Sequence, residues 1–231
     1  MDKISLLIIS IAIGGIIYPL IYYWPLQPQE TEVDPLSTFT VCHPVEDLNK
    51  STVTFDGSIT WTKDYCLKWD DFQGIPDPKN DKTAFTAWRV KTLSDYEILR
   101  SNGSQFRFTK IDVVAFFDKT KSWVKKDVLD LYDIELLRHE QGHFDCAEEH
   151  ARKIENITKT RLMDKIFPIP LVSGNLKIDA RTEADRLARE VFDELFNLQT
   201  LSDIYDNYTV YGTKFREQQE YNLRFDKLRN S

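Results

Sequence analysis

The pattern of hydrophobic and polar positions divides the chain into an apolar beginning, a strand-like middle and a helical end. Residues 4–24 carry no charged side chain. As a helix that rises about 1.5 Å per residue, they would cross a hydrocarbon core of about 30 Å. Tyr22, Tyr23 and Trp24 stand at the far end, where an aromatic belt is expected. The pattern predicts an N-terminal transmembrane helix, with a cleaved signal peptide and a buried core helix as the alternatives.

The sequence around this apolar run predicts how the chain is organised. Residues 26–50 begin LQPQETEVDP, which is rich in proline and acidic residues and has no periodicity, so they form a linker. The first part of this linker has no Lys or Arg, whereas Lys3 precedes the apolar run. The positive-inside bias therefore predicts a single-pass cell-membrane protein. Residues 1–25 are its anchor, and residues 51–231 are an extracytoplasmic domain.

From residue 51 onward, β-branched and aromatic residues gather in short runs that favour strands. STVTF and SITW flank the Asp56-Gly57 pair and resemble a hairpin with a tight turn. Two longer runs with partial alternation follow at residues 83–93 and 105–117. These patterns predict a β-sheet in the first half of the domain.

The second half of the domain has apolar residues at helical spacing. We predict one long helix over residues 128–162 and two further helices over 180–198 and 213–228. Strands followed by helices indicate an α+β domain.

Composition and charge narrow the function classes. Hydrophobic residues make up 42% of the chain and aromatic residues 13%, which is enough for a packed core. The net charge of −7 argues against nucleic acid as the main partner, because phosphate neutralisation needs a basic face. Cys42 and Cys66 flank a strand-like region and could pair in an oxidising compartment, which would leave Cys146 unpaired. Three free thiols are the alternative.

The chain has four histidines, and three of them lie in ELLRHEQGHFDCAEEHAR. His139 and His143 belong to an H-E-x-x-H pattern. On a helix, positions i and i+4 share one face, so both imidazoles can reach one metal ion. Glu140 stands beside them, in reach of a metal-bound water. We predict that His139 and His143 bind Zn²⁺ and that Glu140 is the general base; a solvated helix face is the alternative.

Three neighbours of this pattern receive other roles. His150 lies two turns beyond His143, about 10 Å along the helix axis, which is too far to share the ion. We expect it on the surface or behind the ligands. Cys146 is expected in the core. Gly142, if it faces a cleft, would let a substrate backbone approach closely.

The segment LLRHEQGHFDCAEEHAR resembles the signature of the domain of unknown function 922 family, whose members are described as zinc-dependent proteases. WDDFQGIPD at residues 69–77 is similar to the family's W-x-D-F-x-G-x-P loop, and YDNYTVYG at 205–212 resembles its Y-D-x-x-T-x-H-G pattern. The resemblance covers about residues 55–225 and implies a zincin-like peptidase.

One departure concerns the third metal ligand. Tyr211 stands where the family often has a histidine. If that histidine is a ligand in relatives, this chain uses another residue. The candidates are Asp206 in the same motif and three acidic residues of the second predicted helix, Glu183, Glu190 and Glu194.

Together these patterns predict a membrane-anchored zincin-like metallopeptidase that acts on peptide or protein substrates outside the cytoplasmic membrane. Glu140 would take a proton from the attacking water and pass it to the leaving amine. Tyr205, Tyr208 and Tyr211 are candidate donors to the oxyanion. A non-catalytic ectodomain, which keeps the fold as a metal-binding or protein-interaction module, is the alternative.

Overall fold

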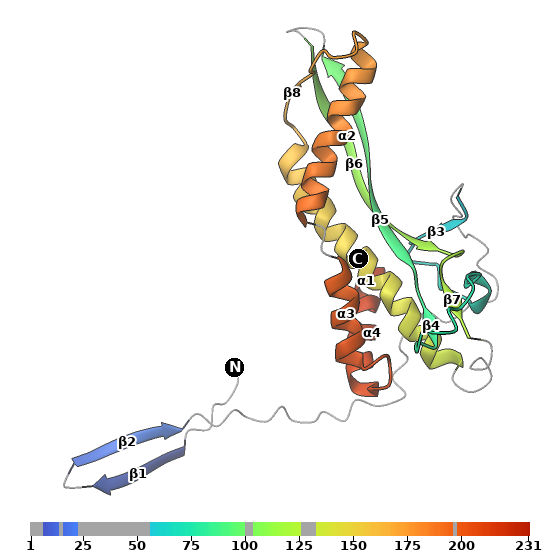
Figure 1. The fold of residues 1–231 in the computed structure, drawn as a ribbon. Helices are drawn as coiled ribbons and strands as arrows, with labels where there is room; N and C mark the ends of the chain where they lie inside the picture. The colour runs from blue at the N-terminus through green and yellow to red at the C-terminus, as the bar shows by residue number, and fades with distance from the viewer. Residues whose placement is uncertain (1–6, 14–15, 23–55, 100–103, 126–132, 196–197) are drawn as a thin grey trace. The chain divides into compact units, whose positions relative to one another are not determined.

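The computed structural model describes residues 7–13, 16–22, 56–99, 104–125, 133–195 and 198–231 (Figure 1). The chain divides into two units, Met1–Phe39 and Thr40–Ser231. The boundary falls within the predicted linker.

The first unit contains a β-hairpin. Strand β1 (Leu7–Ile13) pairs antiparallel with β2 (Ile16–Tyr22). The described part of residues 4–24 is therefore a hairpin where the sequence predicts a helix. The segment is rich in isoleucine, whose branched Cβ favours strands, and Pro19 would remove a hydrogen bond from a helix. Among the described residues, every helix is too short or too polar to cross a bilayer.

The second unit is built on an antiparallel sheet. Its strand order is β3 (Ser58–Thr60), β6 (Gln105–Asp118) and β5 (Trp88–Leu99), and β8 (Phe167–Pro168) also pairs with β6. The β5–β6 pair forms a long hairpin (Figure 1) with a register shift between Asp95 and Tyr96. The strand predicted for 105–117 is confirmed. Of the predicted STVTF–SITW hairpin, residues 51–55 lie outside the described residues.

The strand predicted for residues 83–93 is interrupted. Its beginning forms β4 (Ala84–Phe85), which pairs with β7 (Trp123–Val124), and β5 begins only at Trp88. The hydroxyl of Thr86 donates instead to the backbone oxygen of Glu140 at 3.2 Å. The interruption therefore brings the β4 end of this segment to the H-E-x-x-H helix. A short 3-10 helix, η1 (Trp69–Asp71), lies between β3 and β4 in the chain.

Four helices occur in the described part of the chain: α1 (Asp133–Leu162), α2 (Leu176–Leu195), α3 (Leu198–Thr209) and α4 (Phe215–Arg229). The three predicted helices correspond to α1, α2 and α4. Residues 128–132, the start of the long predicted helix, lie outside the described residues. Helix α3 was not predicted. The α+β class is confirmed.

Helix α1 organises the core. It packs along β5 and β6, and α3 and α4 pack against its N-terminal half (Figure 1). Phe144, Ala147, Ala151 and Ile154 on α1 meet the sheet at Phe117 and neighbouring side chains. Burial of one such phenylalanine contributes about 1.5–3 kcal/mol. Residues 139–148 of α1 are thus covered by the sheet and by the C-terminal helices, so their polar side chains are buried as well.

Cysteine usage differs between the two halves of the domain. Cys66 is disulfide-bonded, and Cys146 is a free buried thiol. Cys42, the remaining cysteine of the sequence, lies outside the described residues.

Candidate metal centre

Helix α1 brings His139 and His143 together as the i, i+4 spacing predicts. Their side chains lie on one face, with ring centroids 4.8 Å apart and ring planes at 80°. The two residues are only 2% and 5% exposed. A histidine pair that is buried at this level needs polar partners, because an unpaired buried imidazole nitrogen costs about 1–3 kcal/mol.

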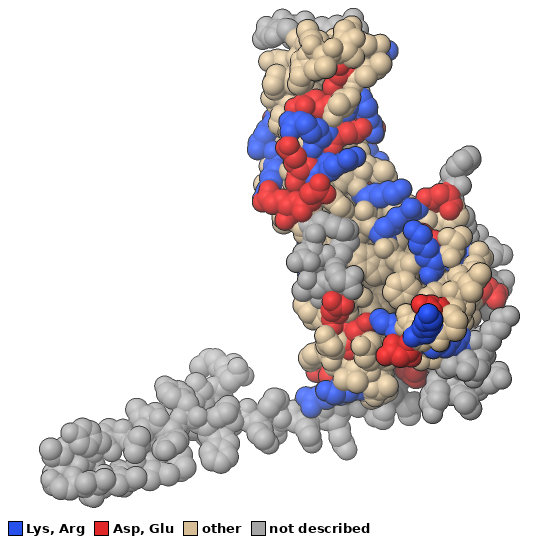
Figure 2. All heavy atoms as spheres, viewed as in Figure 1, with Lys and Arg blue, Asp and Glu red and all other residues tan. Residues whose placement is uncertain are grey.

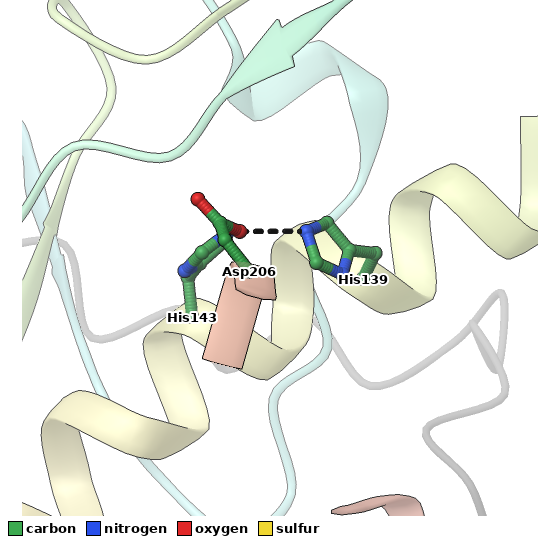
Figure 3. Close-up of side chains that lie close together, drawn as sticks. All are labelled: His139, His143 and Asp206. Atoms are coloured by element: carbon green, nitrogen blue, oxygen red, sulfur yellow. Dashed lines mark hydrogen bonds and ion pairs between the residues drawn. The ribbon is translucent and has the colours of Figure 1, made fainter. Parts of the chain in front are cut away.

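Asp206 of α3 supplies the partner. Its Oδ1 atom lies 3.1 Å from His139 Nε2 and 2.9 Å from His143 Nε2 (Figure 3). One ligand atom from each of these three buried residues lies within 4.8 Å of the others. Two imidazole nitrogens and one carboxylate oxygen are a donor set that binds Zn²⁺ and other transition metals. The group could therefore hold a metal ion.

The other candidates for the third ligand point elsewhere. Glu183 and Glu190 both pair with Arg186, and Glu194 pairs with Arg161 at 2.7 Å. Figure 2 shows charges of both signs interspersed over α2, as these pairs require. Asp206 thus contacts the two histidines, whereas the three glutamates form ion pairs with arginine side chains.

Tight packing between α1 and α3 fixes the position of Asp206. Tyr205 is fully buried, and its ring stacks on His139 at 4.8 Å with an interplanar angle of 11°. A Cβ atom on Gly142 would lie 2.0 Å from Tyr205 Oη. Gly142 therefore admits the tyrosine ring, and its predicted role in admitting a substrate backbone is wrong. The reason is that α3 covers that side of α1.

Each histidine is also contacted at its second ring nitrogen. Gln218 Oε1 lies 3.3 Å from His139 Nδ1, and Ser202 Oγ lies 3.1 Å from His143 Nδ1. The Gln218 oxygen only accepts hydrogen bonds, so it can hold a proton at Nδ1 of His139, which would leave the Nε2 lone pair to a metal when one is bound. Such contacts orient metal-binding histidines. No motif in the sequence pointed to Ser202, because it lies on the unpredicted α3.

Glu140 lies at the edge of a pocket. It is 4% exposed, and its Oε2 atom is buried without a hydrogen-bond partner among the described residues. The pocket has a volume of about 270 Å³ and is lined by the three candidate ligands, Glu140, the segment from Asp81 to Thr86, Leu136, Ser202 and Tyr211. A carboxylate oxygen left unpaired beside a candidate metal site is suited to accept a proton from a water molecule.

The charges around Asp206 favour its ionised form. Burial alone would raise the pKa of this carboxyl group. Hydrogen bonds from His139 and His143, together with the charges of His143 and Lys82, outweigh burial and hold the pKa of Asp206 well below its ordinary value. The carboxylate is therefore in the form that binds a cation.

Of the three tyrosines considered as oxyanion donors, only Tyr211 lines the pocket. Tyr205 is packed behind His139 and its hydroxyl contacts Gln218, at 2.8 Å from Nε2. Tyr208 donates to Glu220 at 2.6 Å on the exposed side of α3.

The remaining polar residues of α1 have structural roles. His150 lies outside the metal group, and Cys146 packs against Tyr205 and Phe225 in the core, as predicted. Asp145 accepts hydrogen bonds from Trp61 Nε1 at 2.6 Å and from the Arg229 guanidinium. These contacts tie α1 to the sheet and to the end of α4, away from the histidines.

A scan against models of protein families finds no match, and searches among curated proteins and solved structures find no similar protein. The resemblance of the α1 motif to the domain of unknown function 922 family therefore stays a prediction.

Proposed function

We propose that this chain is a zinc-dependent, zincin-like metallopeptidase. The observation that supports the proposal most is the position of Glu140. Its Oε2 atom has no hydrogen-bond partner among the described residues, and Glu140 lines one pocket together with His139, His143 and Asp206. Two histidines, one carboxylate and an adjacent glutamate are the groups that hydrolysis by a metal-activated water requires.

Zinc bound there would act as a Lewis acid and lower the pKa of a bound water. Glu140 would accept a proton from the attacking water as the water oxygen forms a bond to the scissile carbonyl carbon. The same carboxyl group would then donate the proton to the amine nitrogen as the carbon–nitrogen bond breaks, so Glu140 would return to its ionised form. Gln218 and Ser202 hold the imidazoles in place through Nδ1.

We further propose that the domain works outside the cytoplasmic membrane, attached through the N-terminal apolar segment. The uncharged residues 4–24 support attachment. The disulfide at Cys66 supports an oxidising compartment, because disulfides persist mainly in exported proteins. The substrate would then be a peptide or an exported protein.

One observation favours a second candidate, a structural metal site in a non-catalytic ectodomain. All three candidate ligands are at most 5% exposed. Closed sites of this kind serve stability, whereas catalytic sites keep a position open to water.

The substitution Glu140→Gln distinguishes the peptidase from the structural metal site. The amide is nearly isosteric but cannot accept the proton, so we expect the metal to be retained and hydrolysis to fall by about 10²–10⁴-fold. Cleavage of a peptide library at matched zinc loading is the measurement. Glu135→Gln on the exposed side of α1, where Glu135 pairs with Arg138, is the matched control and should cleave like the wild type.

Equal cleavage by wild type and Glu140→Gln would refute the proposed mechanism. Stoichiometric zinc without cleavage of any peptide by the wild type would favour the structural metal site.

A further inference from the structure

Lys82 contacts the candidate metal group from the opposite side to the histidines. Its Nζ atom lies 3.1 Å from Asp206 Oδ2, whereas both histidines face Asp206 Oδ1. The carboxylate therefore has one oxygen for the metal-binding side and one for the ammonium group. The Lys82 side chain is 35% exposed, and the residue lines the same pocket as Glu140.

Two aromatic rings hold the ammonium group in this position. Lys82 Nζ lies 5.8 Å from the ring centroid of Phe85 and 5.6 Å from that of Tyr211. Both distances are in the range of a cation–π interaction. Tyr211 thus interacts with the lysine beside the site, although it occupies the position of the family's histidine.

The backbone around Tyr211 is strained to achieve this. Val210, Tyr211 and Gly212 have φ values of 49°, 54° and 78°. Non-glycine residues with positive φ are uncommon, and the conformation is strained for a β-branched residue such as Val210. The turn places Gly212 so close to His139 that an added Cβ would lie 3.0 Å from the histidine Cβ. The strained turn therefore contacts both a candidate ligand and the lysine.

The loop that carries Lys82 is also held in place. The Lys82 N–H donates to Asn80 Oδ1 at 2.9 Å, and Lys125 Nζ donates to the Asn80 backbone oxygen at 2.6 Å. The Lys125 N–H donates to the Thr83 backbone oxygen at 2.9 Å. These bonds fix the backbone on both sides of Lys82, so the lysine approaches Asp206 from a defined position.

We propose that Lys82 is a positioning residue, which restricts Asp206 to one ligand oxygen and is itself held by Tyr211 and Phe85. The inference rests on the proposed metal binding at this site. If Asp206 Oδ2 were released, the carboxylate could bind through both oxygens. The extra ligand atom would occupy a coordination position that the water or the substrate carbonyl needs.

The test compares the full-length wild type with Lys82→Met and Lys82→Arg. Methionine has similar length and no charge, whereas arginine restores a cation that binds carboxylates. Lys121→Met is the matched control, because the Lys121 side chain is 75% exposed and its Nζ atom lies 3.7 Å from the Asp118 carboxylate, which does not line the pocket. Zinc affinity is measured by competition with a chromophoric chelator, and coordination is followed through the visible spectrum of bound Co²⁺.

We expect Lys82→Met to bind zinc no more weakly than the wild type, because the carboxylate gains a second ligand atom and a nearby positive charge is lost. The Co²⁺ absorption should weaken, since five-coordinate cobalt absorbs less than four-coordinate cobalt. Lys82→Arg should restore both properties, and Lys121→Met should match the wild type.

Unchanged affinity and an unchanged Co²⁺ spectrum in Lys82→Met would overturn the inference, even if the melting temperature fell. Weaker zinc binding with an unchanged Co²⁺ spectrum would also overturn it, because the lysine would then support the site without controlling how Asp206 binds. A wild type that binds no metal would refute the proposed function together with this inference. The expected affinities and spectra without peptide cleavage would refute the peptidase alone.

Discussion

At the residue scale, the candidate site depends on which carboxylate reaches the two histidines. Asp206 and Glu194 were equivalent candidates in the sequence. In the structure, the Asp206 side chain is 7% exposed and contacts both imidazoles, whereas the Glu194 side chain is 63% exposed and pairs with Arg161. An exposed ion pair of this kind contributes about 0–1 kcal/mol. The two acidic residues should therefore respond differently to the same change.

We predict that Asp206→Asn abolishes stoichiometric zinc binding, because a neutral amide oxygen is a much weaker ligand than a carboxylate. Glu194→Gln, the matched control, should bind one zinc per chain and change the free energy of unfolding by less than about 1 kcal/mol. Metal content of the purified proteins by mass spectrometry is the measurement. Wild-type zinc content in Asp206→Asn, or its loss in Glu194→Gln, would show that the wrong carboxylate has been assigned.

At the scale of elements, the site depends on how closely α3 approaches α1. Gly142 makes this approach possible, since any side chain there would overlap Tyr205. The stacking of Tyr205 on His139 places the next residue, Asp206, opposite the histidine pair. One glycine in the middle of a helix thus determines which residue completes the site.

We predict that Gly142→Ala destabilises the protein by about 1–3 kcal/mol, the usual cost of overpacking. The sign of the change in the free energy of unfolding tests the packing, because a glycine-to-alanine change within a helix ordinarily stabilises by about 1 kcal/mol. Urea unfolding followed by circular dichroism measures the difference. Asn156→Ala, at an exposed position of α1, is the control and should be neutral or slightly stabilising. If Gly142→Ala were as stable as that control, the close packing of α3 on α1 would be disproved.

At the scale of the whole molecule, the N-terminal unit and the domain differ in character. Residues 4–24 carry no charge, whereas the domain has charged residues over its surface (Figure 2). The described part of the apolar segment is a hairpin, β1–β2. Apolar side chains favour transfer out of water whether the segment is a helix or a hairpin. We therefore propose membrane attachment through this segment.

We predict that the full-length chain is recovered with the membrane fraction and that protease added to intact cells digests the domain. Deletion of residues 4–24 should release the domain from the membrane fraction. Immunoblotting of the fractions for the C-terminus, with a cytoplasmic protein as a control for cell integrity, is the measurement. A domain fully protected in intact cells would reverse the proposed topology, and a full-length chain found only in the soluble fraction would exclude the anchor.

Local pattern predicted much of the domain. The apolar spacing of α1, α2 and α4 identified these helices, and the β-branched and aromatic run at residues 105–117 identified β6. The pairing of His139 with His143 also followed from sequence, because i and i+4 share a face of any α-helix. These features depend on neighbours in the chain, which is the information that periodicity contains.

Features that depend on distant contacts needed the tertiary structure. Helix α3 is short and rich in Asp, Asn, Thr and Tyr, which are indifferent helix formers, so its sequence carries a weak signal. The apolar run at residues 4–24 satisfied the length rule for a membrane helix, and an unbroken apolar run has no period that would distinguish a helix from strands.

The sequence alone determined two histidines on one helix with a glutamate beside them. Only the tertiary structure decided that Asp206 meets them and that Lys82 and Tyr211 stand behind Asp206. These residues come from three segments far apart in the chain. They meet because α3 packs on α1 at Gly142 and because Thr86, next to β4, hydrogen-bonds to the backbone of Glu140. Neither contact produces a hydrophobic period in the sequence, because each joins residues that are far apart in the chain.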